Sequence, residues 1–414
     1  MTMSTFKTVL SRYIKGHFFL SQRSYGAVPA LQKLTEEDTL KLTYAINSLK
    51  YHEESSLIFL KIKGSNAEDV ASFSNATCRL QTSIGPEVEL KIRRKRFGFA
   101  SIFHPGIKIL ENFLQNSSNV PKDSSRLEAL KRLIDFVPKI PNVSQRLRLA
   151  EENKQELVWS LQLLHHYLKE LSVNQSYLID HNSKLKETQC SHSEGITVDY
   201  GDTSLGSESV WHGNVDAMLG IQNIPVNFLH NYDEDKIEGK QFSFSNEQSS
   251  FDISADQSTL HHREQQLVSQ AIVFAFLQRK LHSTDFKHFL IPSIGMSREQ
   301  AVIYFYDPDH DILMKNLHPF ELFGDEDGGL YYATVIALWL GVNYPILGSG
   351  IGKSIKNTRF TADFMKTMSQ PVQDKYKYEL QFGGVRSKPK DTEPPKYVYD
   401  VLFDEPLVPS LGQI

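Results

Sequence analysis

The chain has 414 residues, 40% of them hydrophobic and 23% charged, a composition typical of a globular protein with room for two or three domains. Its formal net charge of -4 excludes a global attraction to nucleic acid, so any such contact requires a local basic patch. The two cysteines, Cys78 and Cys190, exclude a disulfide framework, and no uninterrupted apolar run is long enough to cross a bilayer. We therefore expect an intracellular protein in a reducing compartment, with no membrane partner.

Residues 1–30 differ in composition from the rest of the chain. No acidic residue precedes Glu36, several lysines and arginines are present, and the apolar residues between them fall at helical spacing. This pattern resembles a mitochondrial presequence, and it is also typical of a basic amphipathic helix that packs on a core. Two hypotheses stay open: a cleaved segment that directs import into the mitochondrial matrix, or an ordinary first helix.

Residues 31–120 are expected to form a small α+β region. The stretch LTEEDTLKLTYAINSLK (34–50) predicts a helix capped by Thr35, with Asp38 three residues further on. Alternating apolar residues predict strands over 55–64 and 86–103.

The second of these strands carries the densest positive charge in the sequence. Two phenylalanines stand beside a cluster of four basic residues: Arg93, Arg94, Lys95 and Arg96. Such a cluster suits contacts to the phosphates and bases of DNA or RNA, or a nuclear import signal. The alternative is a solvated edge strand whose charges prevent pairing with another chain. Nucleic-acid binding by this cluster, and a nuclear location, are therefore hypotheses.

Residues 121–345 alternate between helical and strand patterns. Helices are predicted over 126–137, with a capping box formed by Ser125 and Glu128, and over 144–172, 263–282 and 330–344. Strands are predicted at VWHGNVDAMLG (210–220) and IPVNFL (224–229), and over 288–297 and 299–314. Two polar stretches, 173–208 and 231–262, are expected to be a mobile loop and a disordered insertion. This order favours an α/β fold with helices on a mixed sheet, followed by a partly flexible C-terminal extension over 346–414.

The stretch LGSGIGKS (347–354) looks like a phosphate-binding loop. A loop of this kind requires a glycine four residues before the Gly-Lys-Ser triplet, and Leu347 occupies that position. The preceding residues also predict a helix, where such a loop needs a strand. A nucleotide site here is the third functional hypothesis, behind the two that follow.

Asp216 stands among apolar residues in a predicted strand, where a buried carboxylate is costly unless it is paired or bound to a metal. One interpretation places it at a strand end facing water. The other gives it a role in a site, and the neighbouring elements supply a context for that role.

The order of a helix, an aspartate-bearing strand, a second strand and a glutamine-bearing helix resembles the PD-(D/E)XK (restriction-endonuclease-like) superfamily. It is most similar to the branch that contains RecB-type exonucleases, over roughly residues 145–315. The resemblance implies a restriction-endonuclease-like mixed sheet flanked by helices and a Mg²⁺-dependent nuclease. It also implies that Asp216 and Glu156 (or Glu152) bind the metal, and that Gln266 or Gln270 is the helix glutamine. Hard oxygen ligands and a polarised water are what phosphodiester hydrolysis with Mg²⁺ requires.

In the superfamily the aspartate ends the second strand of the fold, and the strand that follows it is the third. Here that following strand, IPVNFL (224–229), departs from the superfamily pattern. It should carry an acid, any residue and a lysine, but IPVNFLHN offers Asn227 as its first polar side chain. The nearest substitutes for the lysine are Lys236, Lys240 and Lys280. Two hypotheses follow: an active metal-dependent phosphodiesterase acting on DNA or RNA, or a catalytically degenerate descendant. A non-catalytic scaffold or partner-binding protein is the alternative from another class.

Overall fold

A computed structural model describes residues 31–52, 55–82, 97–152, 156–180, 199–220, 224–228, 255–324, 328–352, 355 and 360–385; for residues 82, 151–152, 156–158, 224–228 and 255–263 it describes the backbone alone. The contacts within the chain separate residues 1–33 from residues 34–414, and the second unit is described here. The expected targeting segment over 1–30 and the basic cluster Arg93–Arg96 lie outside the described residues.

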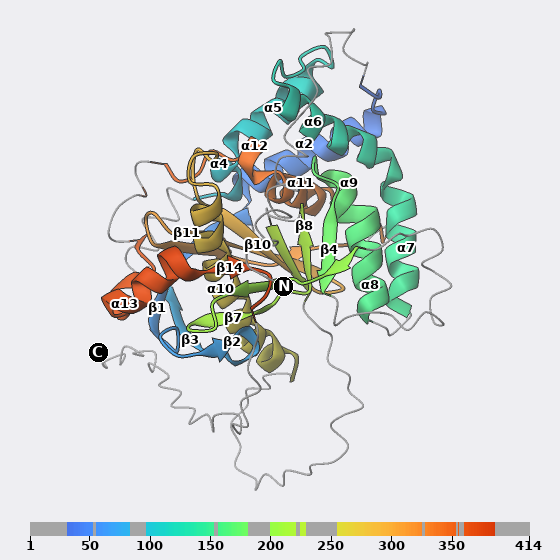
Figure 1. Cartoon of the computed structure of the whole chain (residues 1–414). Helices are drawn as coiled ribbons and strands as arrows, with labels where there is room; N and C mark the ends of the chain where they lie inside the picture. Colours follow the sequence, from blue (N-terminus) through green and yellow to red (C-terminus); the bar gives the residue numbers. More distant parts are fainter. Residues whose placement is uncertain are drawn as a thin grey trace, which may run out of the picture. The chain divides into compact units, whose positions relative to one another are not determined.

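A ten-stranded mixed sheet is the framework of this unit. Most neighbouring strands are antiparallel, whereas β9 and β10 run parallel, as do β4 and β5. The α/β class predicted from the sequence is therefore confirmed (Figure 1). In spatial order the strands are β3 (Cys78–Thr82), β1 (Leu57–Ser65), β12 (Ile312–Asn316), β11 (Gln300–Asp307), β10 (Ile291–Met296), β9 (Ile224–Phe228), β8 (Ala217–Leu219), β4 (Tyr177–Asp180) and β5 (Tyr200–Gly201), with β13 (Phe320–Glu321) paired to β11.

Helix α10 (Ala255–Leu281) packs against both this sheet and a smaller one. It contacts β10 and β11 of the large sheet and β6 and β7 of a four-stranded sheet. The space beside it is filled by mutually contacting aromatic side chains: Trp211, Phe276, Tyr306, Phe364 and Tyr376. In spatial order the smaller sheet contains β14 (Gln381–Phe382), β6 (Ser204–Gly206), β7 (Trp211–Asn214) and β2 (Ala71–Ser72).

Helix α11 (Tyr332–Val342) covers the opposite face of the large sheet. Its residues Ala333–Val342 are all buried, and Gly341 lies against Ile294 of β10 and Ile303 of β11. No helix in the described part of the chain is both long and apolar enough to span a membrane. The remaining helices are α2 (Glu36–Tyr51), α4 (Phe99–Ile102), α5 (His104–Gln115), α6 (Ser124–Phe136), α7 (Ile140–Glu152), α8 (Glu156–Leu163), α9 (Lys169–Leu171), α12 (Tyr344–Leu347) and α13 (Gln370–Asp374), with a π-helical turn, η4 (Leu164–Leu168), between α8 and α9.

The regions expected over 31–120, 121–345 and 346–414 all contribute to this one unit. Strand β1 of the first region pairs with β12 of the second, from Leu57 opposite Asn316 to Leu60 opposite Leu313. Strand β14 of the third region pairs with β6 of the second. The sheets therefore join segments that are far apart in the sequence.

Two predicted helix caps have different outcomes. Thr35 caps α2 as predicted, since its hydroxyl oxygen accepts a hydrogen bond from the backbone N–H of Asp38 at 3.0 Å. The predicted capping box of Ser125 and Glu128 is wrong. Asp123 is the N-cap of α6, and its carboxylate accepts from the N–H of Arg126 at 2.9 Å. Aspartate is as good an N-cap as serine, so the helix begins two residues earlier than the serine suggested.

Three strand assignments also need correction. The stretch 173–208 is not a single polar loop, because it contains β4, β5 and β6. The strand predicted over 299–314 is two strands, since Asp307 accepts hydrogen bonds from the next turn of chain and starts a hairpin. Finally, the end of the strand predicted over 86–103 is helical from Phe99 to Ile102.

Candidate functional site

Asp216 lies where the chain passes from one sheet to the other. The stretch VWHGNVDAMLG is not one strand: Trp211–Asn214 belong to the small sheet as β7, and Ala217–Leu219 to the large sheet as β8. Between them, Val215 is buried and Asp216 is partly exposed. An alternating pattern cannot reveal such a crossing, because both halves satisfy it.

Asp180, at the end of β4, is the neighbour of Asp216 across the sheet. Ile179 is paired with Ala217, and the N–H of Asp180 donates to the carbonyl oxygen of Asp216 at 3.0 Å. The Asp180 side chain is 8% exposed, and its Oδ1 accepts a hydrogen bond from Nδ2 of Asn214 at 2.8 Å. Asp180 at the end of β4 is thus opposite Asp216, which directly precedes β8, in a position where paired residues share one side of the sheet.

The same row continues through the next two strands. Ala217 is paired with Val226, so one further step of the register places Asn227 of β9 opposite Asp216. Asn227 is in turn paired with Gly295 of β10. The row across the sheet is therefore Asp180 of β4, Asp216 directly before β8, Asn227 of β9 and Gly295 of β10.

Helix α10 lies over the β10 end of this row. A Cβ atom on Gly295 would come within 2.7 Å of Cδ1 of Leu267. The absence of a side chain at Gly295 therefore allows α10 to pack closely against β10. One turn beyond Leu267, Gln270 is 1% exposed, and its Oε1 has no hydrogen-bond partner in the described part of the chain. The hydroxyl of Ser293, two residues before Gly295 on β10, is also buried and has no hydrogen-bond partner in the described part of the chain. A buried polar atom without a partner costs about 1–3 kcal/mol, which makes this region a place for water or a ligand atom.

The two glutamines suggested for the site differ in their environment. Gln270 is buried under the sheet, whereas Gln266 is partly exposed, and its carbonyl oxygen accepts from the Ser269 hydroxyl at 2.8 Å. Gln270 is therefore the better candidate for the helix glutamine.

Of the other predicted site residues, the structure describes the side chain of Lys280 alone. Glu152 ends α7 and Glu156 begins α8, and their side chains are not described. Lys236 and Lys240 are outside the described residues. Lys280 does not take the role of the missing lysine: it lies ten residues after Gln270 on α10, or about 15 Å along the helix axis. Its Nζ donates to the carbonyl oxygen of Leu380 at 2.8 Å.

A cation that the sequence did not single out lies on the α10 side of the sheet. Lys315, the one charged residue of the strand ILMKN, donates through Nζ to Glu264 of α10, which also accepts from the Tyr304 hydroxyl. Three strands separate β12 from β8, so this ammonium is about 19 Å from Asp216 across the sheet. It joins α10 to the sheet and does not complete the site.

The available ligands set what the site can do chemically. Within the described residues, no group of three or more His, Cys, Asp or Glu side chains is placed to hold a metal ion. Asp180 and Asp216 provide two carboxylates, and such oxygen ligands suit a hard divalent cation that keeps several waters. Asp180 was missed because it lies in the stretch taken as a loop. Its signal was the short strand-like run YLID (177–180) ending in an acid.

The glycine-rich stretch at 347–352 does not have the form of a phosphate-binding loop. It follows helix α12 rather than a strand. Both Gly348 and Gly350 lie against the imidazole of His288, at 3.0 and 2.6 Å from the positions that a Cβ would take. The N–H of Ser349 donates to the carbonyl oxygen of Ile102 at 2.8 Å. The imidazole therefore fills the space beside these two glycines, and Lys353 and Ser354 of the stretch lie outside the described residues.

Comparisons with models of protein families, with curated proteins and with solved structures returned no match. The class of this protein is therefore inferred from its own fold and side chains. The fold supports the class α/β, and the two aspartates with the helix glutamine define the candidate site.

Proposed function

We propose that this chain is a PD-(D/E)XK-like protein, either a metal-dependent nucleic-acid phosphodiesterase or a descendant of one that has lost part of its catalytic set. The observation that carries the proposal is the row formed by Asp180 of β4, Asp216 directly before β8, and Asn227 of β9. The carboxylates of Asp180 and Asp216 would hold Mg²⁺, and the metal would polarise a phosphodiester and its attacking water.

The order of elements around this row supports the proposal. Helices α8 and α9 precede three antiparallel strands, β4, β8 and β9. Helix α10 then leads to β10, which lies parallel to β9. The resemblance implied a helix, an aspartate-bearing strand, a second strand and a glutamine-bearing helix. Asp216 directly before β8, the following strand β9 and Gln270 on α10 agree with that order, although β5, β6 and β7 intervene between β4 and β8.

The third strand supports the form with a reduced catalytic set. Asn227 stands opposite Asp216, where the superfamily pattern has an acid, and Leu229 stands two residues later, where it has a lysine. An amide remains a neutral oxygen ligand for a hard cation, but it adds no negative charge. We expect weak metal binding and slow or absent cleavage. The basic cluster Arg93–Arg96 is proposed to contact the phosphates of the same nucleic acid.

Removing the charge of either aspartate tests the site. Asp216→Asn and Asp180→Asn keep the shape of the side chain, and the second keeps an oxygen that can accept from Asn214. Each change is expected to weaken Mn²⁺ binding by at least about tenfold, because a carboxylate ligand becomes a neutral amide. The measurement is a calorimetric titration with Mn²⁺, followed by incubation with labelled single-stranded DNA and RNA.

The matched control is Asp69→Asn, an exposed aspartate in a turn of the same unit. Cleavage that requires both Mn²⁺ and Asp216 identifies an active phosphodiesterase, and Mn²⁺ binding without cleavage identifies the reduced descendant. If all three variants bind Mn²⁺ as tightly as the unchanged protein does, the proposal is wrong. It is also wrong if the unchanged protein does not bind Mn²⁺. A scaffold or partner-binding role then takes its place.

A further inference from the structure

A cavity lies between helices α5 and α6, away from the row of aspartates. Its volume is about 610 Å³. Gly106 of α5 packs against Leu340 of α11, and Trp339 of α11 donates to the carbonyl oxygen of Ala129 in α6 at 2.7 Å. Both walls of the cavity are therefore attached to α11, on the face of the sheet opposite α10.

Three permanent cations line this cavity: Lys108 from α5, Lys122 from the connection, and Arg126 from α6. In the described part of the chain, none of their side chains forms an ion pair or donates a hydrogen bond. One carboxylate, that of Asp123, also lines the cavity, and its Oδ1 is already used as the N-cap of α6. Three positive charges and one negative charge leave a net charge of two positive units at one opening.

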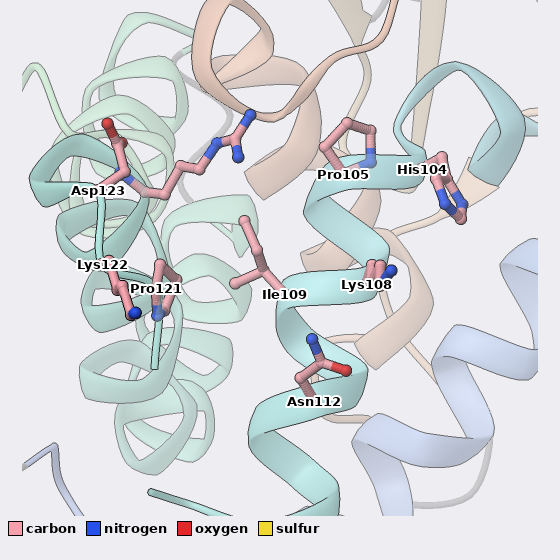
Figure 2. A pocket seen from close by; sticks show the side chains of 9 residues that line it. His104, Pro105, Lys108, Ile109, Asn112, Pro121, Lys122 and Asp123 are labelled. Atoms are coloured by element: carbon pink, nitrogen blue, oxygen red, sulfur yellow. The ribbon is translucent and has the colours of Figure 1, made fainter. Parts of the chain in front are cut away.

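The remaining wall of the cavity is apolar. It is formed by Pro105, Ile109 and Pro121. Figure 2 shows Ile109 projecting from α5 into the space between the helices, where Pro121 and Lys122 face it from the segment before α6. Sites for small organic ligands typically have volumes of about 300–1,000 Å³, with apolar walls and a few placed charges. The volume and the lining both fall within that description.

We propose that this cavity binds a small organic phosphate. The phosphate would accept hydrogen bonds from Lys122 and from the guanidinium of Arg126, which suits two phosphate oxygens at once. The organic part would lie on Ile109 and the two prolines. The walls of this site contact α11, on the face of the sheet opposite α10, so the site is independent of the proposed nuclease-like site and does not rest on it.

Calorimetry on the full chain tests the proposal with adenosine 5′-monophosphate as the probe. Arg126→Gln and Lys122→Gln are each expected to weaken binding by about tenfold, because each removes a charged donor to the phosphate. Raising the salt concentration should weaken binding further, since the cations lie near the surface. Adenosine and inorganic phosphate, titrated separately, should both bind more weakly than the mononucleotide.

The matched control is Lys131→Gln, which removes a lysine of α6 that does not line the cavity. Loss of binding in the two cavity variants, with the control unchanged, supports the assignment. Absence of binding to the unchanged protein overturns it, as does equal binding by all variants. Adenosine or inorganic phosphate binding as tightly as the mononucleotide also overturns it. Circular dichroism of each variant verifies that the helices are retained. Failure of Mn²⁺ binding at Asp216 would leave these outcomes unaffected.

Discussion

His166 lies in the π-helical turn η4. Burial, together with the neighbouring His165 and Arg146, lowers its pKa to about 4, against an opposing effect of Glu170. The two imidazoles lie edge to face, with ring centres 4.9 Å apart. Burial also lowers the pKa of His165, whose Nδ1 is 3.0 Å from the hydroxyl of Tyr177. A second proton on either ring is therefore disfavoured in the folded protein.

This shift predicts a loss of stability in mild acid. In the unfolded chain His166 takes up a proton near pH 6.5, whereas in the folded protein it does so near pH 4. The stability is complete above pH 6.5 and is lost as the pH falls toward 4, because the unfolded state binds the extra proton. Because His166 is only half-buried, solvent screening reduces the effect. We expect the free energy of unfolding to fall by on the order of 1–2 kcal/mol between pH 7.5 and pH 4.5. Urea unfolding at pH 7.5 and at pH 4.5 measures it.

His166→Gln should remove most of this difference between the two pH values. His318→Gln, at an exposed position, is the control and should keep it. Equal pH dependence in both variants would contradict the assignment to His166.

Individual site residues were predictable only in part. Asp216 was identified because a carboxylate among apolar residues requires an explanation, and Gln270 because it is one of the two glutamines of the amphipathic helix that the resemblance selected. The choice between Gln266 and Gln270 needed the packing of Leu267 on Gly295, which sets which face of α10 is buried. Asp180 could not be recognised as its partner, because the register between β4 and β8 joins residues 36 positions apart.

Among the elements, α9 and α11 are joined by one buried amide. Asn343, which follows α11, is 2% exposed. Its Nδ2 donates to the carbonyl oxygens of Leu171 and Trp339 at 2.9 and 2.8 Å, and its Oδ1 accepts from the N–H of Val173 at 2.9 Å. These hydrogen bonds satisfy backbone groups where α9 ends and the chain turns toward β4.

Asn343→Ala is expected to destabilise the protein by about 3 kcal/mol, because it leaves buried backbone groups of Leu171 and Val173 without partners. Chemical denaturation followed by circular dichroism measures the change. Asn47→Ala, at an exposed position of α2, is the control and should alter stability by less than about 0.5 kcal/mol. A loss at Asn343 no greater than at Asn47 would contradict the role given to the amide.

Elements with a strong local signal were predicted, and those held by distant pairing were not. The helix over 34–50 and the apolar helix over 330–344 are confirmed as α2 and α11. The turn that divides β11 from β12 had a signal in the residues DPDHD (307–311), where Asp311 has φ of 50°. Such a run favours a turn. The aromatic residues before it favour a strand so strongly that the prediction extended one strand through the turn. The very short strands β5 and β6 carry little pattern and depend on their partners.

In the molecule as a whole, the edge of the large sheet is built from the N-terminal region. Strand β1 lies between β3 and β12, and Phe59 packs against Phe97 and Phe360. Removal of this region would expose the backbone of β12 along one side, together with the apolar surface that β1 covers.

A truncated chain that begins at residue 121 is therefore expected to aggregate or to lose cooperative unfolding. A chain that begins at residue 34 keeps all of the second unit and should unfold cooperatively. Thermal denaturation and size-exclusion chromatography of the two chains test the difference. A monomeric and cooperative chain from residue 121 would contradict the view that residues 31–120 share one unit with the rest.

The sequence by itself determined the class α/β, the long helices, and the identity of Asp216 and the helix glutamines as residues that need a role. These features depend on local periodicity and composition, which each segment carries alone. Only the tertiary structure decided that VWHGNVDAMLG passes between two sheets, that Asp180 stands opposite Asp216, and that α5 and α6 line an open cavity with cations along its walls. Each of these depends on which distant segments become neighbours. Strand register and helix packing are set by the burial of surfaces between segments, and no single segment contains that information.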